Sequence, residues 1–318
     1  MDPRTITRGL IVVCLLLGAI LPHPVWSQDS VPQPGLDSVP HPSLSVEPAS
    51  LIEGTLAWLR IRPSVDANIV AGAAAGEPIH FQPSDSGFKA LVGVPMDVGD
   101  SLPISVFLQT GDRTDTVHTS VPVRKGGYPS EVLAVAPAFV KPDSIASARI
   151  RAELARSKEV SRRSQERPQI WRGPFQVPRA SRITSPFGTA RVYNRELQGR
   201  HLGTDFAGTI GAPVRAAGRG VVAMVADFYL AGRAVYIDHG GGVITAYFHL
   251  SRAYVSEGDT VVAGQRIGAV GRSGRVTGPH LHWVARYGAI SVDPMSLLQL
   301  EKMAPPITSK SSDQPGGR

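Results

Sequence analysis

The chain has 318 residues and a mass of 33.8 kDa, which at roughly 150 residues per domain predicts two domains. Its apolar content of 42% suffices for two hydrophobic cores, while a mean hydropathy of −0.01 excludes a protein with many membrane spans. The single cysteine excludes an internal disulfide and a cysteine-rich zinc site. With 33 glycines, 27 prolines and 6% aromatic residues, the composition favours strands and turns over a helical bundle.

The first residues carry the pattern of an export signal. Arg4 and Arg8 precede an apolar run from Gly9 to Leu21, and the small residue Ser27 follows two prolines. This pattern predicts a secretory signal peptide over residues 1–27. The alternative is an uncleaved anchor, for which the apolar run is short. We therefore expect a secreted or periplasmic protein of the cell envelope, with no membrane span after signal cleavage.

A proline-rich linker and a β module are predicted next. Residues 28–44 contain the near-repeat DSVPQPGL and DSVPHPSL, which is typical of an extended spacer. Residues 45–125 contain five short apolar runs between turn signals, namely Leu56 to Ile61, Ile69 to Ala75, Phe88 to Val94, Ile104 to Leu108 and Val117 to Val123. This spacing predicts an immunoglobulin-like β-sandwich module with a spacing or binding role.

Residues 126–178 are expected to form a basic, partly helical connector. Asp143 and Ser144 can cap a helix that begins near Ile145. Residues 141–167 contain eight basic and four acidic residues, and residues 179–298 contain thirteen arginines and seven acidic residues. The simplest interpretation is that these charged residues form a solvated surface. The alternative is that their positive charge attracts an anionic polymer of the envelope. Nucleic acid is not expected as a partner, because the chain is predicted to be exported and has no reading motif.

Residues 179–298 read as an antiparallel β domain. Apolar runs begin at Val214, Val221, Ala234, Val243 and Ile267, and glycine-rich turns separate them. Residues 299–318 are polar and rich in Pro, Ser and Gly, so a disordered tail is expected. The predicted fold class is therefore all-β and mainly antiparallel: a sandwich module and a β-rich catalytic domain, joined by a partly helical connector.

The strongest chemical signal is a cluster of five histidines between positions 201 and 282. His201 and Asp205 are four apart, a spacing that places both side chains on one side of a strand. His280 and His282 are two apart and project from one face of a strand. Imidazole and carboxylate are good zinc ligands, and a buried histidine pair without a metal would be costly. Arg191, Tyr193 and Asn194, just before His201, can line the groove.

The two other histidines of this cluster, His249 and His239, can also be explained without a role in metal binding. His249 lies at the end of an apolar run and is either a core histidine or a proton-handling group facing the groove. His239 lies in a turn signal and is interpreted as structural. The chain lacks H-E-x-x-H and G-x-S-x-G, which argues against a zincin and a serine hydrolase.

Several ordered motifs resemble one family, the lysostaphin-type (LytM-like) zinc metallopeptidases, which cut peptides of bacterial peptidoglycan. The motifs span about residues 183–294 and are Ile183-Thr-Ser-Pro-Phe-Gly188, His201-x-Gly203-x-Asp205, Gly211-Ala-Pro-Val214, Asp238-His239-Gly240, Tyr247-x-His249-Leu250, Gly264-Gln265-x-Ile267-Gly268 and Gly278-Pro-His280-Leu-His282. The resemblance implies that His201, Asp205 and His282 bind Zn²⁺, and that His280 and His249 are the catalytic histidines.

This resemblance implies a secreted zinc metalloendopeptidase for cross-links or stem peptides of peptidoglycan, with a zinc-activated water and histidine acid–base assistance. An alternative is a non-catalytic LytM-type regulator that activates another cell-wall hydrolase, and the intact ligand positions argue against it. A peptidase for soluble proteins would use the same zinc site. The N-terminal module or the connector can also lie across the groove and reduce activity.

Overall fold

The structure, a computed structural model, describes residues 42–63, 67–85, 87–195 and 197–300. The predicted signal peptide (1–27), most of the predicted linker (28–44) and nearly all of the predicted tail (299–318) lie outside these residues. In the described part of the chain, no helix is both long and apolar enough to cross a membrane.

Two β-sheets form the N-terminal part of the described chain. One sheet has the order β1-β3-β7-β6, and its strands are β1 (Ser43–Glu47), β3 (Leu56–Arg62), β7 (Gly87–Gly93) and β6 (Gln82–Ser84). The other has the order β2-β9-β8-β4-β5, with β2 (Leu51–Ile52), β9 (Arg113–Arg124), β8 (Ser101–Thr110), β4 (Asn68–Ala74) and β5 (Glu77–Pro78). The five predicted apolar runs fall in β3, β4, β7, β8 and β9. Ser43 and Leu44, assigned to the linker from the sequence, belong instead to β1.

The two sheets enclose a common apolar core. Side chains alternate across a strand, so Leu102, Ile104, Val106 and Leu108 of β8 point to one face and are buried. They share a cluster with Leu59 of β3 in the other sheet. The predicted sandwich is therefore present, while its immunoglobulin-like identity stays a prediction.

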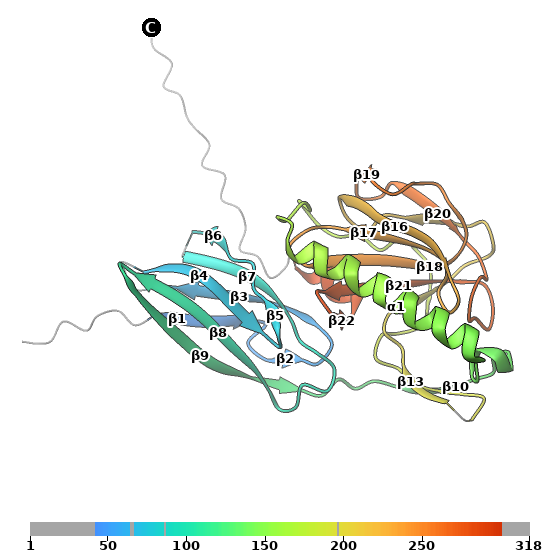
Figure 1. The fold of residues 1–318 in the computed structure, drawn as a ribbon, viewed down its shortest axis with the longest axis horizontal. Helices are drawn as coiled ribbons and strands as arrows, with labels where there is room; N and C mark the ends of the chain where they lie inside the picture. The colour runs from blue at the N-terminus through green and yellow to red at the C-terminus, as the bar shows by residue number, and fades with distance from the viewer. Residues whose placement is uncertain (1–41, 64–66, 86, 196, 301–318) are drawn as a thin grey trace, which may run out of the picture. The chain divides into compact units, whose positions relative to one another are not determined.

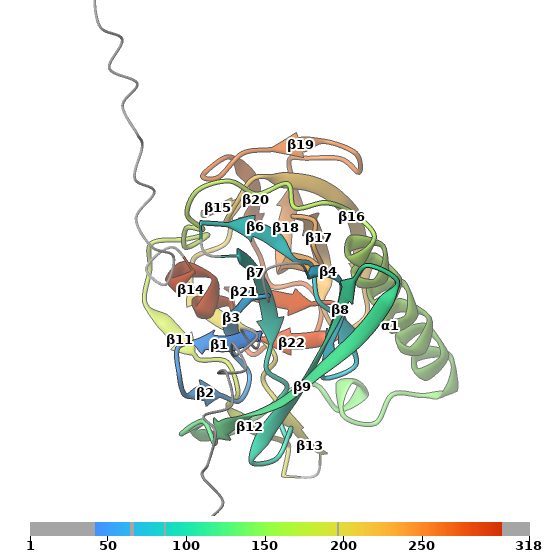
Figure 2. The ribbon, with the colours of Figure 1, turned by 90° about the vertical axis from the view of Figure 1, so that its left-hand side faces the viewer.

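The connector contains β10 (Ser130–Leu133), a 3-10 helix (Pro137–Phe139) and α1 (Ser144–Gln165). The predicted helix cap is confirmed, because the Asp143 carboxylate accepts a hydrogen bond from the Ala146 amide at 2.7 Å. Figures 1 and 2 show α1 lying along β16, β17 and β18 of the second domain. Its buried residues are three serines, Ser157, Ser161 and Ser164. The packing face of α1 therefore consists of small side chains, and the weak apolar stripe in its sequence did not predict it.

The second domain is built on one large antiparallel sheet. Its main order is β11 (Ile183–Ser185), β14 (Thr204–Ala207), β21 (His280–Tyr287), β18 (Val243–Ala253), β17 (Gly232–Asp238), β16 (Gly220–Phe228) and β19 (Thr260–Val261). Three further strands join it, β15 (Pro213–Arg215), β20 (Arg266–Val270) and β22 (Ile290–Val292). The prediction of a mainly antiparallel all-β fold is confirmed.

Strand β21 separates the domain core from the candidate site. Leu281, Trp283, Ala285 and Tyr287 belong to the main core cluster, whereas Val284 belongs to a smaller cluster on the opposite face. Val160 of α1 packs against that smaller cluster. By alternation, His280 and His282 lie on the same face as Val284, the face that α1 partly covers.

A small third sheet links the connector to the second domain. Its order is β10-β12-β13, with β12 (Ala190–Tyr193) and β13 (Leu197–Arg200). β10 pairs with β12 in parallel, which places Glu131 opposite Arg191. The connector is therefore hydrogen-bonded to β12, which in turn pairs with β13, the strand that directly precedes His201.

Gln299 and Leu300, which the sequence assigned to the tail, belong to the folded part of the described chain. A 3-10 helix runs from Pro294 to Gln299, and Leu300 is buried. The Leu300 carbonyl accepts a hydrogen bond from the Trp58 indole at 3.0 Å. Leu300 is thus held by tertiary packing. The polar composition of residues 299–318, from which a disordered tail was predicted, gives no sign of this contact.

We expect Ser161→Leu to destabilise the fold. Ser161 is 2% exposed, so a larger side chain must displace the neighbours of α1 at a cost of about 1–3 kcal/mol. Urea unfolding measures the change. The matched control is Ala155→Leu on the exposed face of the same helix, which should leave stability nearly unchanged. Equal stability of the two variants would show that the serine face is not close-packed.

Candidate metal centre

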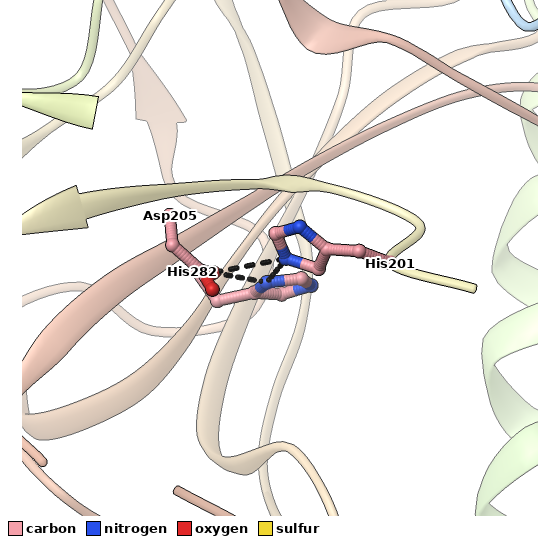
Figure 3. A group of neighbouring side chains, drawn as sticks. All are labelled: His201, Asp205 and His282. Atoms are coloured by element: carbon pink, nitrogen blue, oxygen red, sulfur yellow. Dashed lines mark hydrogen bonds and ion pairs between the residues drawn. The ribbon is translucent and has the colours of Figure 1, made fainter. Parts of the chain in front are cut away.

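Three predicted ligand residues converge on one point. Asp205 on β14 is the direct cross-strand partner of His282 on β21, and His201 lies in the short segment between β13 and β14. Figure 3 shows the three side chains pointing toward one another. One potential ligand atom from each lies within 4.8 Å of the others. The backbone register, set by strand pairing, thus brings together residues that are far apart in sequence.

The ring nitrogens and carboxylate oxygens are arranged as metal donors. Asp205 Oδ1 is 3.1 Å from His201 Nε2 and 2.7 Å from His282 Nδ1, and the two nitrogens are 2.9 Å apart. His201 Nδ1 is 2.8 Å from the Pro186 carbonyl oxygen. A carbonyl can only accept, so Nδ1 carries the proton and Nε2 presents its lone pair to the centre. Two imidazole nitrogens and one carboxylate oxygen are a donor set that suits zinc.

The ordinary acid–base properties of the centre are strongly altered by burial. His201 is 1% exposed and Asp205 is 5% exposed. Burial lowers the pKa of His282 to about 4, although the Asp205 carboxylate opposes this. Burial alone would raise the pKa of Asp205, but the charge of His282 and hydrogen bonds from both histidines hold that pKa well below its usual value.

The glycine of the His201-x-Gly203-x-Asp205 motif is required by close packing. A Cβ atom at Gly203 would lie 2.6 Å from the Trp283 carbonyl oxygen and 2.7 Å from the His282 ring. A side chain there would push β21 and its ligand away. The motif therefore combines two ligands with the one residue that lets β14 approach β21 closely.

Arg191 fixes the orientation of the Asp205 carboxylate. Its Nη2 donates to Asp205 Oδ2 at 2.8 Å, while its Nε donates to Glu131 Oε1 at 2.5 Å. Asp205 Oδ2 is thereby occupied, and Oδ1 remains directed at the two histidines. The sequence singled out Arg191, but Glu131 carried no signal because it lies in the connector.

His249 and His280 stand beside the three ligand residues. Their ring centroids are 4.9 Å apart, and the His249 ring is 5.8 Å from the His282 ring. Each donates Nδ1–H to a backbone carbonyl at 2.8 Å, His249 to Ser273 and His280 to Gly278. Each therefore keeps a lone pair at Nε2. Burial, followed by the neighbouring His282 and His280, lowers the pKa of His249 well below its ordinary value.

His249 also adopts an unusual backbone conformation. Its φ is +61°, in the left-handed region that a non-glycine residue enters at a cost of about 1 kcal/mol or more. Such conformations concentrate at functional sites, where the position of a side chain matters more than local stability.

Two other predicted positions lie outside the centre. His239 is fully buried and bonds to the Arg219 carbonyl and the Thr245 hydroxyl, so its role is structural. Asn194 forms two hydrogen bonds with the backbone of Val135, and this ties it to the connector rather than to the groove.

Two depressions flank the centre. The first, of about 270 Å³, is lined by His201, His282 and by residues of α1 that include Ile150 and Leu154. The second, of about 230 Å³, is lined by Asp205, His280 and connector residues that include Glu131 and Leu133. Four residues line both depressions: Arg191, Tyr193, His249 and Arg275. The connector thus borders the centre, whereas the described residues between 45 and 125 line neither depression.

The fold and the donor set define a β-sheet domain with a candidate metal centre of two histidines and one aspartate. Residues 199–294 match the model of peptidase family M23. Peptidoglycan DD-endopeptidase ShyA of Vibrio cholerae is 48% identical over 103 residues, covering 32% of this chain and 24% of that protein. DD-carboxypeptidase/endopeptidase Mpg of Neisseria meningitidis is 43% identical over 117 residues, covering 37% of this chain and 27% of that protein.

A solved structure is similar over a longer stretch. A crystal structure from Pseudomonas aeruginosa, provisionally described as peptidase M23, has a TM-score of 0.59 and 26% identity. It covers 78% of this chain, and 94% of its own length is matched. Residues 199–294 therefore form a domain of peptidase family M23, and the resemblance to the lysostaphin-type metallopeptidases is confirmed. The chain spans about a quarter of the length of the curated relatives named above.

Removal of Arg191 should weaken metal binding. Without its guanidinium, the Asp205 carboxylate can rotate, and loss of such an orienting contact lowers metal affinity by roughly 10- to 100-fold. Competition with a chromophoric zinc chelator measures the affinity of Arg191→Met. Arg182→Met, at an exposed position nearby, is the control and should bind zinc as the unmodified chain does. Unchanged affinity in Arg191→Met would show that Asp205 needs no support.

Acid should destabilise the metal-free protein through its buried histidines. Burial lowers the pKa of His239 to about 4, while the unfolded chain has a value near 6.5. The unfolded state therefore binds more protons between these values, and stability falls as pH drops from about 6.5 to about 4. Each such group contributes up to about 1.4 kcal/mol per pH unit. Urea unfolding across this pH range should show a smaller slope for His239→Gln, and an identical slope would contradict the assignment.

Proposed function

We propose that the chain is a zinc metalloendopeptidase that hydrolyses peptide bonds of peptidoglycan, in cross-links or stem peptides, outside the cytoplasm. The observation that carries this proposal is the convergence of His201, Asp205 and His282 beside the paired rings of His249 and His280. Three protein ligands with space on one side are typical of a catalytic metal, whereas structural zinc sites have four.

The donors present fit a zinc ion. His201 Nε2, His282 Nδ1 and Asp205 Oδ1 would hold it, with the Pro186 carbonyl and Arg191 orienting two of these groups. When bound, zinc supplies Lewis-acid chemistry, which polarises a carbonyl group and makes water a better nucleophile near neutral pH.

The two remaining histidines would handle protons. A lone pair at Nε2 lets His249 or His280 accept a proton from the attacking water and later return one to the leaving amine. The lowered pKa of His249 keeps its ring neutral near pH 7, which is the form that accepts a proton. As a cation after proton transfer, either ring would also stabilise a developing oxyanion.

The substrate class is supported by the relatives. Both curated relatives named above are described as acting on peptidoglycan or as DD-peptidases. The predicted signal peptide agrees with a substrate in the envelope. An additional contact with anionic envelope polymers stays a prediction, and on α1 several arginines already pair with glutamates, such as Arg162 with Glu159.

We expect the purified chain to bind one zinc ion and to release amino groups from peptidoglycan sacculi. His201→Ala should lose both properties. His280→Ala should retain zinc but lose roughly 100- to 10,000-fold in activity, as expected for a proton-transfer residue. Elemental analysis and assay of new amino groups measure these results.

The matched control is His118→Ala, an exposed histidine of β9, which should change neither property. Bound zinc without cleavage by the unmodified chain would favour the alternative of a non-catalytic regulator. Loss of zinc in His280→Ala would move His280 into the ligand set and contradict its proposed role.

A further inference from the structure

Arg275 presents a guanidinium group at the junction of the two depressions. It lines both of them, and its guanidinium carbon lies 4.3 Å from the centroid of the Tyr193 ring. Within residues 42–63, 67–85, 87–195 and 197–300, no carboxylate lies within ion-pair distance of Arg275. A guanidinium group that lies over an aromatic ring is held through its own flat face. The N–H donors at the edge of the guanidinium stay available for a ligand.

The segment that carries Arg275 is firmly held against the centre. The Arg275 amide donates to the Leu230 carbonyl at 2.8 Å. Two residues earlier, the Ser273 hydroxyl donates to the Leu250 carbonyl and accepts from the Arg233 amide. The Ser273 carbonyl is the group that orients His249. The same short segment therefore positions a proposed catalytic histidine and the guanidinium group.

The other arginines that line the depressions have different tasks. Arg191 is occupied by Asp205 and Glu131, and Arg200 donates to the Gly188 carbonyl. Arg286 donates to the Ser157 hydroxyl of α1. It lies four residues beyond His282 on β21, about 13 Å along the strand, so it is remote from the ligands.

We propose that Arg275 binds a free carboxylate of the substrate peptide, on a residue next to the bond that is cut. This inference rests on the proposed function and names its substrate class: peptides that carry an acidic group beside the scissile bond. Guanidinium and carboxylate form two parallel charge-assisted hydrogen bonds, a geometry that a carboxamide cannot reproduce. Tyr193 acts as a positioning residue, because the Arg275 guanidinium lies over its ring.

The test compares two soluble cross-linked peptides that differ in one group, a free carboxylate beside the cross-link or the corresponding carboxamide. Cleavage is measured with the zinc-loaded chain, and binding is measured by calorimetry with zinc-loaded His280→Ala. The unmodified chain should prefer the acid by roughly 10- to 100-fold, the range expected for a hydrogen-bonded charge pair. Arg275→Gln should remove this preference by raising KM for the acid alone.

Matched variants separate recognition from folding. Arg272→Gln changes an exposed arginine of the same segment that lines neither depression, and it should keep the full preference. Tyr193→Phe keeps the stacking ring and should also keep it, whereas Tyr193→Leu should reduce it. A preference that survives in Arg275→Gln, or an equal loss for acid and amide, would overturn the proposal.

The outcomes also distinguish this inference from the proposed function. Equal cleavage of both peptides by the unmodified chain would leave the peptidase function standing and reject the role of Arg275. Absence of cleavage, with binding that still prefers the acid and depends on Arg275, would reject the peptidase function and retain carboxylate recognition. Absence of both cleavage and binding would reject both.

Discussion

The candidate centre depends on the antiparallel pairing of β14 with β21. This pairing places Asp205 directly opposite His282, and the missing side chain of Gly203 allows the close approach. A shift of register by one residue would turn His282 into the core and Trp283 toward the groove, because side chains alternate along a strand. The buried Trp283, Leu281 and Ala285 oppose that shift. The apolar core therefore determines which side chains can form the site.

The connector completes the centre from outside the sheet. Through its parallel pairing with β12, β10 brings Glu131 to Arg191, and Arg191 in turn holds Asp205. On the other side, α1 rests on the sheet through its serines and supplies Ile150 and Leu154 to one depression. The segment between the two β domains is thus part of the functional unit rather than a simple spacer.

The sequence predicted the strands, the helix cap and the five residues that the structure brings together around the candidate site, because each of these features has a local pattern. Alternation and glycine turns identify strands, and spacings of two and four place histidines and the aspartate on common faces. The roles of Glu131 and Arg275 could not be predicted, since each depends on a contact with a distant segment. The serine face of α1 was also missed. An amphipathic pattern identifies a packing face by its hydrophobic residues, whereas this face is made of small polar side chains that pack closely.

The left-handed backbone at His249 has a consequence for the balance between stability and activity. Glycine would adopt φ = +61° without the steric penalty that a side chain brings at this position. The presence of histidine at this position is explained by its imidazole, which the Ser273 carbonyl holds next to the His280 ring. The backbone strain at this position therefore opposes stability, while the side chain that causes it is the one proposed to transfer protons, so a laboratory screen for heat-resistant variants would test that position directly.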